Sequence, residues 1–120
     1  MGRLQDITPQ QDVVNKINAQ TDFTYNINKT RVERYTISVQ NIFTGKNPSL
    51  YLKDTWQVVD DAFNSNHELL GGWLDKQDGV YYLDYNLSVS NLKDAMKIAK
   101  FNKQLAIYDN VSQKVIPVAD

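Results

Sequence analysis

The sequence predicts an α+β fold of the ferredoxin-like, split βαβ type. From residue 32 onward, segments with a period of two and segments with a helical period follow in the order strand, helix, strand, strand, helix, strand. An extra N-terminal helix precedes this unit and an extra C-terminal strand follows it. Such an order favours an antiparallel sheet with both helices of the unit on one face.

The N-terminal part of the chain predicts one short helix. The 120 residues fit a single domain, in which residues 1–31 form an N-terminal helix and loop and residues 32–120 the α+β core. Thr8 is a suitable N-cap and Pro9 a suitable first residue for a helix over 9–20. Its apolar stripe is narrow, so we expect this helix at the margin of the domain. Residues 21–30 have no clean period and predict a loop or a ragged strand.

The next two elements are a strand over 32–43 and a helix over about 50–64. Alternation in the strand places Tyr35, Ile37, Val39 and Phe43 on one face and Arg34, Thr36, Ser38 and Gln40 on the other. In the helix, Leu52, Trp56, Val59 and Phe63 recur at spacings of four, three and four, which predicts one buried stripe. We therefore expect Trp56 in the core.

A β-hairpin is predicted from the stretch GGWLDKQDGVYYLDYNLSV. Residues 68–74 and 80–89 form its strands, and Gly79 accepts the positive φ that the turn requires. The pair Gly71-Gly72 indicates a kink or bulge that turns Trp73 onto the helices, so Trp73 is a second expected core residue.

The last elements are a helix over 91–101 and strands over 105–109 and 115–118. Asn91 is a suitable N-cap, and Ala95 and Ala99 let the helix approach the sheet closely. In the split βαβ arrangement, strands 32–43 and 80–89 are neighbours at the centre of the sheet. Their polar faces then lie side by side.

Composition excludes several classes of chemistry. The chain has no cysteine, so disulfides, thiol catalysis and thiolate metal sites are excluded. His67 is the only histidine, and phosphate-binding glycine motifs are absent, so we expect no enzyme activity, no cofactor and no metal. Net charge is -1 without a basic cluster, and no apolar run is long enough to span a bilayer. We expect a soluble cytoplasmic protein without a membrane partner.

One pattern of residues runs from the hairpin into the segment after it. Its members are Gly72, Trp73, Asp75, Gly79, Tyr81 to Asp84, Ala95, Ala99, Asn102, Gln104, Ala106, Ile107 and Asp109. This pattern resembles one in small uncharacterised proteins of phages and mobile elements. The resemblance covers residues 71–109 only. It implies a phage or plasmid origin, hence the host cytoplasm, and it implies no catalytic residue.

The polar face of the predicted sheet is the candidate binding surface. We expect a non-enzymatic binding protein that docks on a host or viral protein, with action against a host defence system as one form of this role. The alternative is a module for single-stranded nucleic acid or nucleotides. It is the weaker prediction, because this face has only one or two aromatic residues and an acidic neighbour instead of a basic surround. A second copy of the chain is a further candidate partner. The binding residues predicted on this face are Arg34, Gln40, Tyr82, Asp84, Asn86 and Tyr108.

Overall fold

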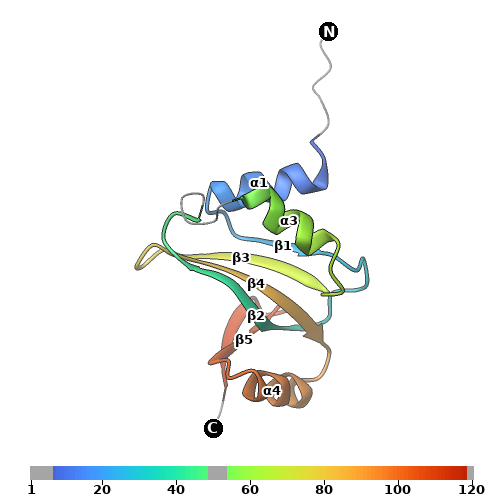
Figure 1. Cartoon of the computed structure of the whole chain (residues 1–120). Helices are drawn as coiled ribbons and strands as arrows, with labels where there is room; N and C mark the ends of the chain where they lie inside the picture. The colour runs from blue at the N-terminus through green and yellow to red at the C-terminus, as the bar shows by residue number, and fades with distance from the viewer. Residues whose placement is uncertain (1–6, 49–53, 119–120) are drawn as a thin grey trace.

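A computed structural model describes residues 7–48 and 54–118 of the chain. These residues form three helices and one six-stranded antiparallel open sheet with the strand order β1-β3-β4-β2-β5-β6 (Figure 1). An α+β fold is thereby confirmed. The elements are α1 (Pro9–Asn18), β1 (Phe23–Asn26), β2 (Tyr35–Gly45), α3 (Thr55–Phe63), β3 (Leu69–Asp75), β4 (Val80–Val89), α4 (Leu92–Phe101), β5 (Ala106–Asp109) and β6 (Lys114–Pro117).

The two strands predicted to be central are neighbours in the sheet. β2 pairs antiparallel with β4, the hairpin partner β3 lies beyond β4, and β5 pairs with the other edge of β2. Three local predictions are also confirmed. Thr8 and Asn91 cap α1 and α4 through their side-chain oxygens, and Gly79 has a φ of 74°. The predicted start of the second helix, with Leu52, lies outside the described residues.

A first core lies between the sheet and the helix pair α1 and α3. Buried side chains of both helices meet Leu70 of β3 and Tyr81, Leu83 and Tyr85 of β4. The ring of Phe63, near the end of α3, stacks on Tyr25 of β1 with 4.5 Å between centroids. The three apolar residues of α1 are all buried in this core, although their stripe on the helix is narrow. The segment expected as a loop or ragged strand contains β1, which pairs with β3.

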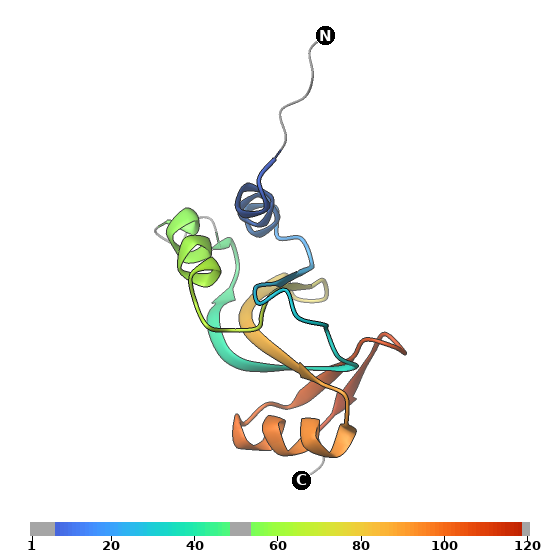
Figure 2. The same cartoon turned by 90° about the vertical axis from the view of Figure 1, so that its right-hand side faces the viewer.

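A second core lies between α4 and the other end of the sheet. Ala95 and Ala99 of α4 are fully buried beside Ile37 of β2 and Ile107 of β5. In both views α4 lies at the end of the molecule opposite to α1 and α3 (Figures 1 and 2). The long strands β2 and β4 run through both cores. In β2, Tyr35 and Ile37 belong to the second core while Val39 packs against the first; in β4, Tyr85 belongs to the first core and Leu87 packs against the second.

Both tryptophans lie outside the core, so their predicted burial is wrong. Trp56 is 43% exposed, because the buried line of α3 runs through Val59 and Ala62 and leaves position 56 at its side. Trp73 is 51% exposed. β3 pairs with β4 in continuous register, without the expected bulge, and Trp73 lies directly opposite Tyr82. Opposed residues share a face, so Trp73 points away from the helices.

Candidate binding pocket on the open sheet face

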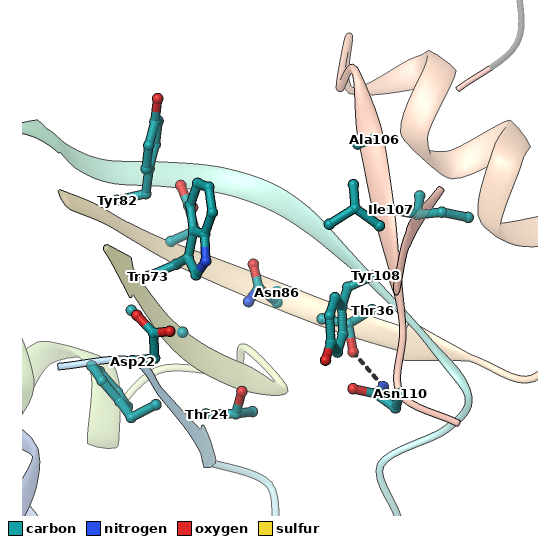
Figure 3. Close-up of a pocket in the computed structure, with 15 residues that line it drawn as sticks. Asp22, Thr24, Thr36, Trp73, Tyr82, Asn86, Ala106, Ile107, Tyr108 and Asn110 are labelled. Carbon is teal, nitrogen blue, oxygen red and sulfur yellow. Dashed lines mark hydrogen bonds between the residues drawn. The ribbon is translucent and has the colours of Figure 1, made fainter. Parts of the chain in front are cut away.

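The sheet face that the helices leave uncovered is hollowed into a pocket. We call this the open face, defined by Tyr82, Asp84 and Asn86 of β4, which alternate with the core residues Tyr81, Leu83 and Tyr85. The pocket has a volume of about 640 Å³ (Figure 3). The described residues that line it are Asp22, Phe23, Thr24, Thr36, Gly71, Gly72, Trp73, Tyr82, Asp84, Asn86, Ala106, Ile107, Tyr108, Asn110 and Val115.

Aromatic side chains stand at the two ends of the pocket. Trp73 and Tyr82 form a tilted pair with 5.5 Å between ring centroids. Tyr108, which is 40% exposed, lies at the other end on β5, where it pairs with Thr36. Figure 3 shows the side chain of Asn86 between these ends. Because large aromatic surfaces are usually buried, three partly exposed rings around one hollow indicate a binding surface.

The floor of the pocket depends on Gly71. A Cβ atom at this position would lie 2.4 Å from Nδ2 of Asn86, so only glycine leaves room for the amide where it now sits. The side chain of Asn86 lines the pocket and is only partly buried. Its amide can therefore donate and accept hydrogen bonds with a ligand.

Asp84 is the partly buried carboxylate of the pocket. Its Oδ1 accepts a hydrogen bond of 2.8 Å from Nδ2 of Asn41. Burial raises the pKa of Asp84, and the hydrogen bonds from Asn41 and Ser38 lower it only in part. A carboxylate in this situation gains from any cation that a ligand brings.

Gln40, one of the predicted binding residues, does not line the pocket. A bulge between Ser38 and Gln40 inserts one residue into β2, and Gln40 then lies opposite the core residue Tyr85. A shift of one residue moves a side chain to the other face of a sheet. Its predicted place on the polar face is therefore wrong. Asn41 takes that place instead, directly opposite Asp84.

Arg34 does not line the pocket either, because it is engaged in an ion pair with Asp109. Nε donates to Oδ1 at 3.0 Å and a terminal guanidinium nitrogen donates to Oδ2 at 2.9 Å. The guanidinium carbon also lies 5.2 Å from the ring centroid of Tyr35. Oδ1 of Asp109 accepts from the backbone N–H groups of Val111 and Ser112 in the loop after β5. Arg34 thus holds β5 and its loop on β2, which is a structural role.

This ion pair predicts a specific loss of stability at low pH. The Arg34 guanidinium, with the backbone N–H groups of Val111 and Ser112, holds the pKa of Asp109 well below its ordinary value of about 3.9. The stabilisation is therefore complete above that value and is lost as pH falls toward the folded-state pKa. We expect Asp109→Asn to lower the melting temperature at pH 7, and the difference from wild type to shrink as pH approaches 2. A difference that is independent of pH, measured by thermal melts followed by circular dichroism, would contradict the assignment.

The loop after β5 positions Tyr108 in the pocket. Nδ2 of Asn110 donates to Oγ1 of Thr36 at 2.8 Å (Figure 3). It also donates to the carbonyl oxygen of Glu33 at 2.9 Å. Of the six predicted binding residues, the pocket therefore brings together Tyr82, Asp84, Asn86 and Tyr108. Two residues that line the pocket, Trp73 and Asn110, were not predicted as binding residues. The continuous alternation of the hairpin, which pairs Trp73 with Tyr82, was the signal for the first.

His67, the only histidine of the chain, lies apart from the pocket. His67 stacks on the ring of Tyr85 with 3.8 Å between centroids. Within residues 7–48 and 54–118, no three His, Cys, Asp or Glu side chains are placed to hold a metal ion. None of the helices in this part of the chain is long and apolar enough to cross a membrane.

Comparison with known proteins adds no family assignment. No family model, no curated protein and no solved structure matches the chain. The resemblance of residues 71–109 to proteins of phages and mobile elements therefore stays a prediction.

Proposed function

We propose that this chain is a non-enzymatic binding domain that holds a segment of another protein in the pocket of the open face. One observation carries the proposal: Trp73, Tyr82 and Tyr108 surround a hollow of about 640 Å³ and keep part of their rings exposed. Rigid aromatic side chains offer a large contact area at low entropic cost, and they dominate the binding energy of protein interfaces.

The chemistry of the pocket supports binding more than catalysis. Among the described residues that line it, none is His, Lys, Ser or Cys, which are the commonest bases and nucleophiles of active sites. Its polar groups are the amides of Asn86 and Asn110, two threonine hydroxyls and two carboxylates. Such groups fix the orientation of a ligand and select it.

Our proposal also includes a ferredoxin-like fold and an origin of the chain in a phage or mobile element. The central strand order β3-β4-β2-β5, antiparallel throughout, supports a ferredoxin-like split βαβ unit. Against the regular form of that fold, α3 and α4 contribute to two separate cores. A role against host defence rests on the sequence resemblance alone.

Trp73→Ala tests the function. Binders are first selected from a displayed peptide library on the wild-type protein. We expect Trp73→Ala to weaken them at least about 30-fold, because loss of an aromatic anchor costs about 2 kcal/mol or more. Trp56→Ala is the matched control, since Trp56 is exposed to a similar degree on α3 and does not line the pocket. We expect it to change affinity less than about threefold. Equal losses for both variants, or selected binders that are all indifferent to Trp73, would contradict the proposal.

Single-stranded nucleic acid is the second candidate, favoured by the row of aromatic rings on a sheet face. Against it, the described residues of the pocket include no Lys or Arg to contact phosphates. Titration with an oligothymidine at several salt concentrations separates the two functions. Nucleic-acid binding requires affinity that falls steeply with salt and that is lost in Trp73→Ala.

A further inference from the structure

Within the part of the chain that the structure describes, the pocket of the open face has a negative charge and its lining holds no compensating cation. Asp22 and Asp84 are its charged residues, and none of the described lining residues is basic. The ion pairs found among the described residues are Lys16 with Asp12 and Arg34 with Asp109. Neither involves a carboxylate of the pocket. A ligand with a positive charge therefore complements this surface, and one with a negative charge is repelled.

The aromatic rings of the pocket favour the same sign of charge. Cations are attracted to the faces of Trp and Tyr rings, and most strongly to Trp. Trp73 and Tyr82 form one such surface, in which Trp73 is half exposed to solvent and Tyr82 is partly exposed. Tyr82 and Asp84 are two residues apart on β4 and point to the same face, which places them about 7 Å apart along the strand. One planar cation can thus contact the rings and the carboxylate together.

We propose that the pocket accepts an arginine side chain of the partner protein, with its guanidinium stacked on Trp73 and Tyr82 and hydrogen-bonded to Asp84. This inference rests on the proposed function and names the chemistry of the bound segment. Arginine fits better than lysine because its flat guanidinium stacks on aromatic rings, carries a fork of donors and is less strongly hydrated. The amide of Asn86, on the floor of the pocket, supplies an acceptor for a further N–H group.

The test uses the full chain and a pair of small probes that differ in charge alone. N-acetylarginine N-methylamide and its citrulline counterpart have almost the same shape, but only the first is cationic. Binding is followed by proton–nitrogen NMR at the indole N–H of Trp73 and the side-chain amide of Asn86. We expect the arginine probe to bind at least tenfold more tightly than the citrulline probe, and more tightly than the corresponding lysine probe.

Two variants locate the interaction. Asp84→Asn removes the carboxylate and keeps the acceptor for Asn41, and we expect it to weaken the arginine probe about tenfold while the citrulline probe is unaffected. Asp94→Asn, an equal charge change at an exposed position of α4, is the control and should leave both probes unchanged. If both variants weakened the arginine probe equally, the effect would come from net charge alone, and the proposal would be overturned.

Failure of this inference is distinguishable from failure of the proposed function. Equal binding of the arginine and citrulline probes, or no shift at Trp73 and Asn86 at tens of millimolar arginine probe, overturns the choice of arginine. Selected peptides that depend on Trp73 but contain no arginine do the same and leave the binding function standing. Peptides that depend on Trp73 and lose at least tenfold in affinity on replacement of one arginine by citrulline support both.

Discussion

Replacing Gly72 with alanine is expected to lower the free energy of unfolding by about 2–4 kcal/mol. A Cβ atom at Gly72 would lie 2.1 Å from Oη of Tyr81 and 2.4 Å from a ring carbon of Phe23. Both groups are fixed. Tyr81 is fully buried and donates a hydrogen bond of 2.9 Å to the carbonyl oxygen of Thr21, and Phe23 belongs to β1, which pairs with Gly72. Alanine therefore overpacks the first core and breaks the partly buried hydrogen bond from Tyr81 to Thr21.

Gly71→Ala is the matched control for this change. Its Cβ atom would meet Nδ2 of Asn86, the end of a flexible side chain that can swing into the pocket. We expect a loss below about 1 kcal/mol, with altered NMR signals of the Asn86 amide. Unfolding in urea, followed by circular dichroism, gives both values. Equal losses at positions 71 and 72 would show that the two glycines are needed for backbone conformation and not for clearance.

A double-mutant cycle identifies the atom responsible. Tyr81→Phe alone should cost about 0.5–1.5 kcal/mol, the value of one buried hydrogen bond. Combined with Gly72→Ala it should cost less than the sum of the two, because the oxygen that alanine displaces is already absent. Strict additivity would place the strain of Gly72→Ala on Phe23 instead.

Much of the fold could be predicted from the sequence because its signals are local. Caps at Thr8 and Asn91 act within three residues, and the turn at Gly79 depends on one φ angle. Alternation in β4 then determines which of its residues face the core. Once β2 and β4 are neighbours, Tyr82, Asp84 and Asn86 are brought to one surface with Tyr108, as the sequence predicted.

The failures come from interactions between distant residues. The bulge that turns Gln40 away from the pocket arises from the pairing between β2 and β4, and no residue type in β2 predicts it. Arg34 does not line the pocket, and its guanidinium is bound by Asp109, 75 positions away along the chain. Trp73 was misplaced because the pair Gly71-Gly72 was interpreted as a kink or bulge, whereas the continuous register of β3 with β4 places Trp73 opposite Tyr82.

Ile37→Ala is expected to have the second large effect, a loss of about 2–5 kcal/mol in the free energy of unfolding. Ile37 is fully buried in the second core, between α4 and β2, where it lies opposite Leu87 of β4. Alanine leaves a cavity there that the paired strands cannot close. Ile116→Ala is the control, because Ile116 packs against the same core from the edge strand β6 and is only partly buried. Its loss should be clearly smaller.

Ile37→Ala also tests whether the two cores unfold together. Trp56 and Trp73 lie on α3 and β3, away from the second core, so their fluorescence reports the other half of the molecule. β4 contributes to both cores, because Tyr81, Leu83 and Tyr85 lie in the first and Leu87 and Val89 pack against the second. If one core unfolds, β4 should therefore lose its native conformation and the other core should unfold with it. We therefore expect fluorescence and circular dichroism to show one transition with the same lowered midpoint in Ile37→Ala. An unchanged fluorescence midpoint beside a two-step circular dichroism curve would mean that the α4 half unfolds alone, with the pocket lost at its Tyr108 end first.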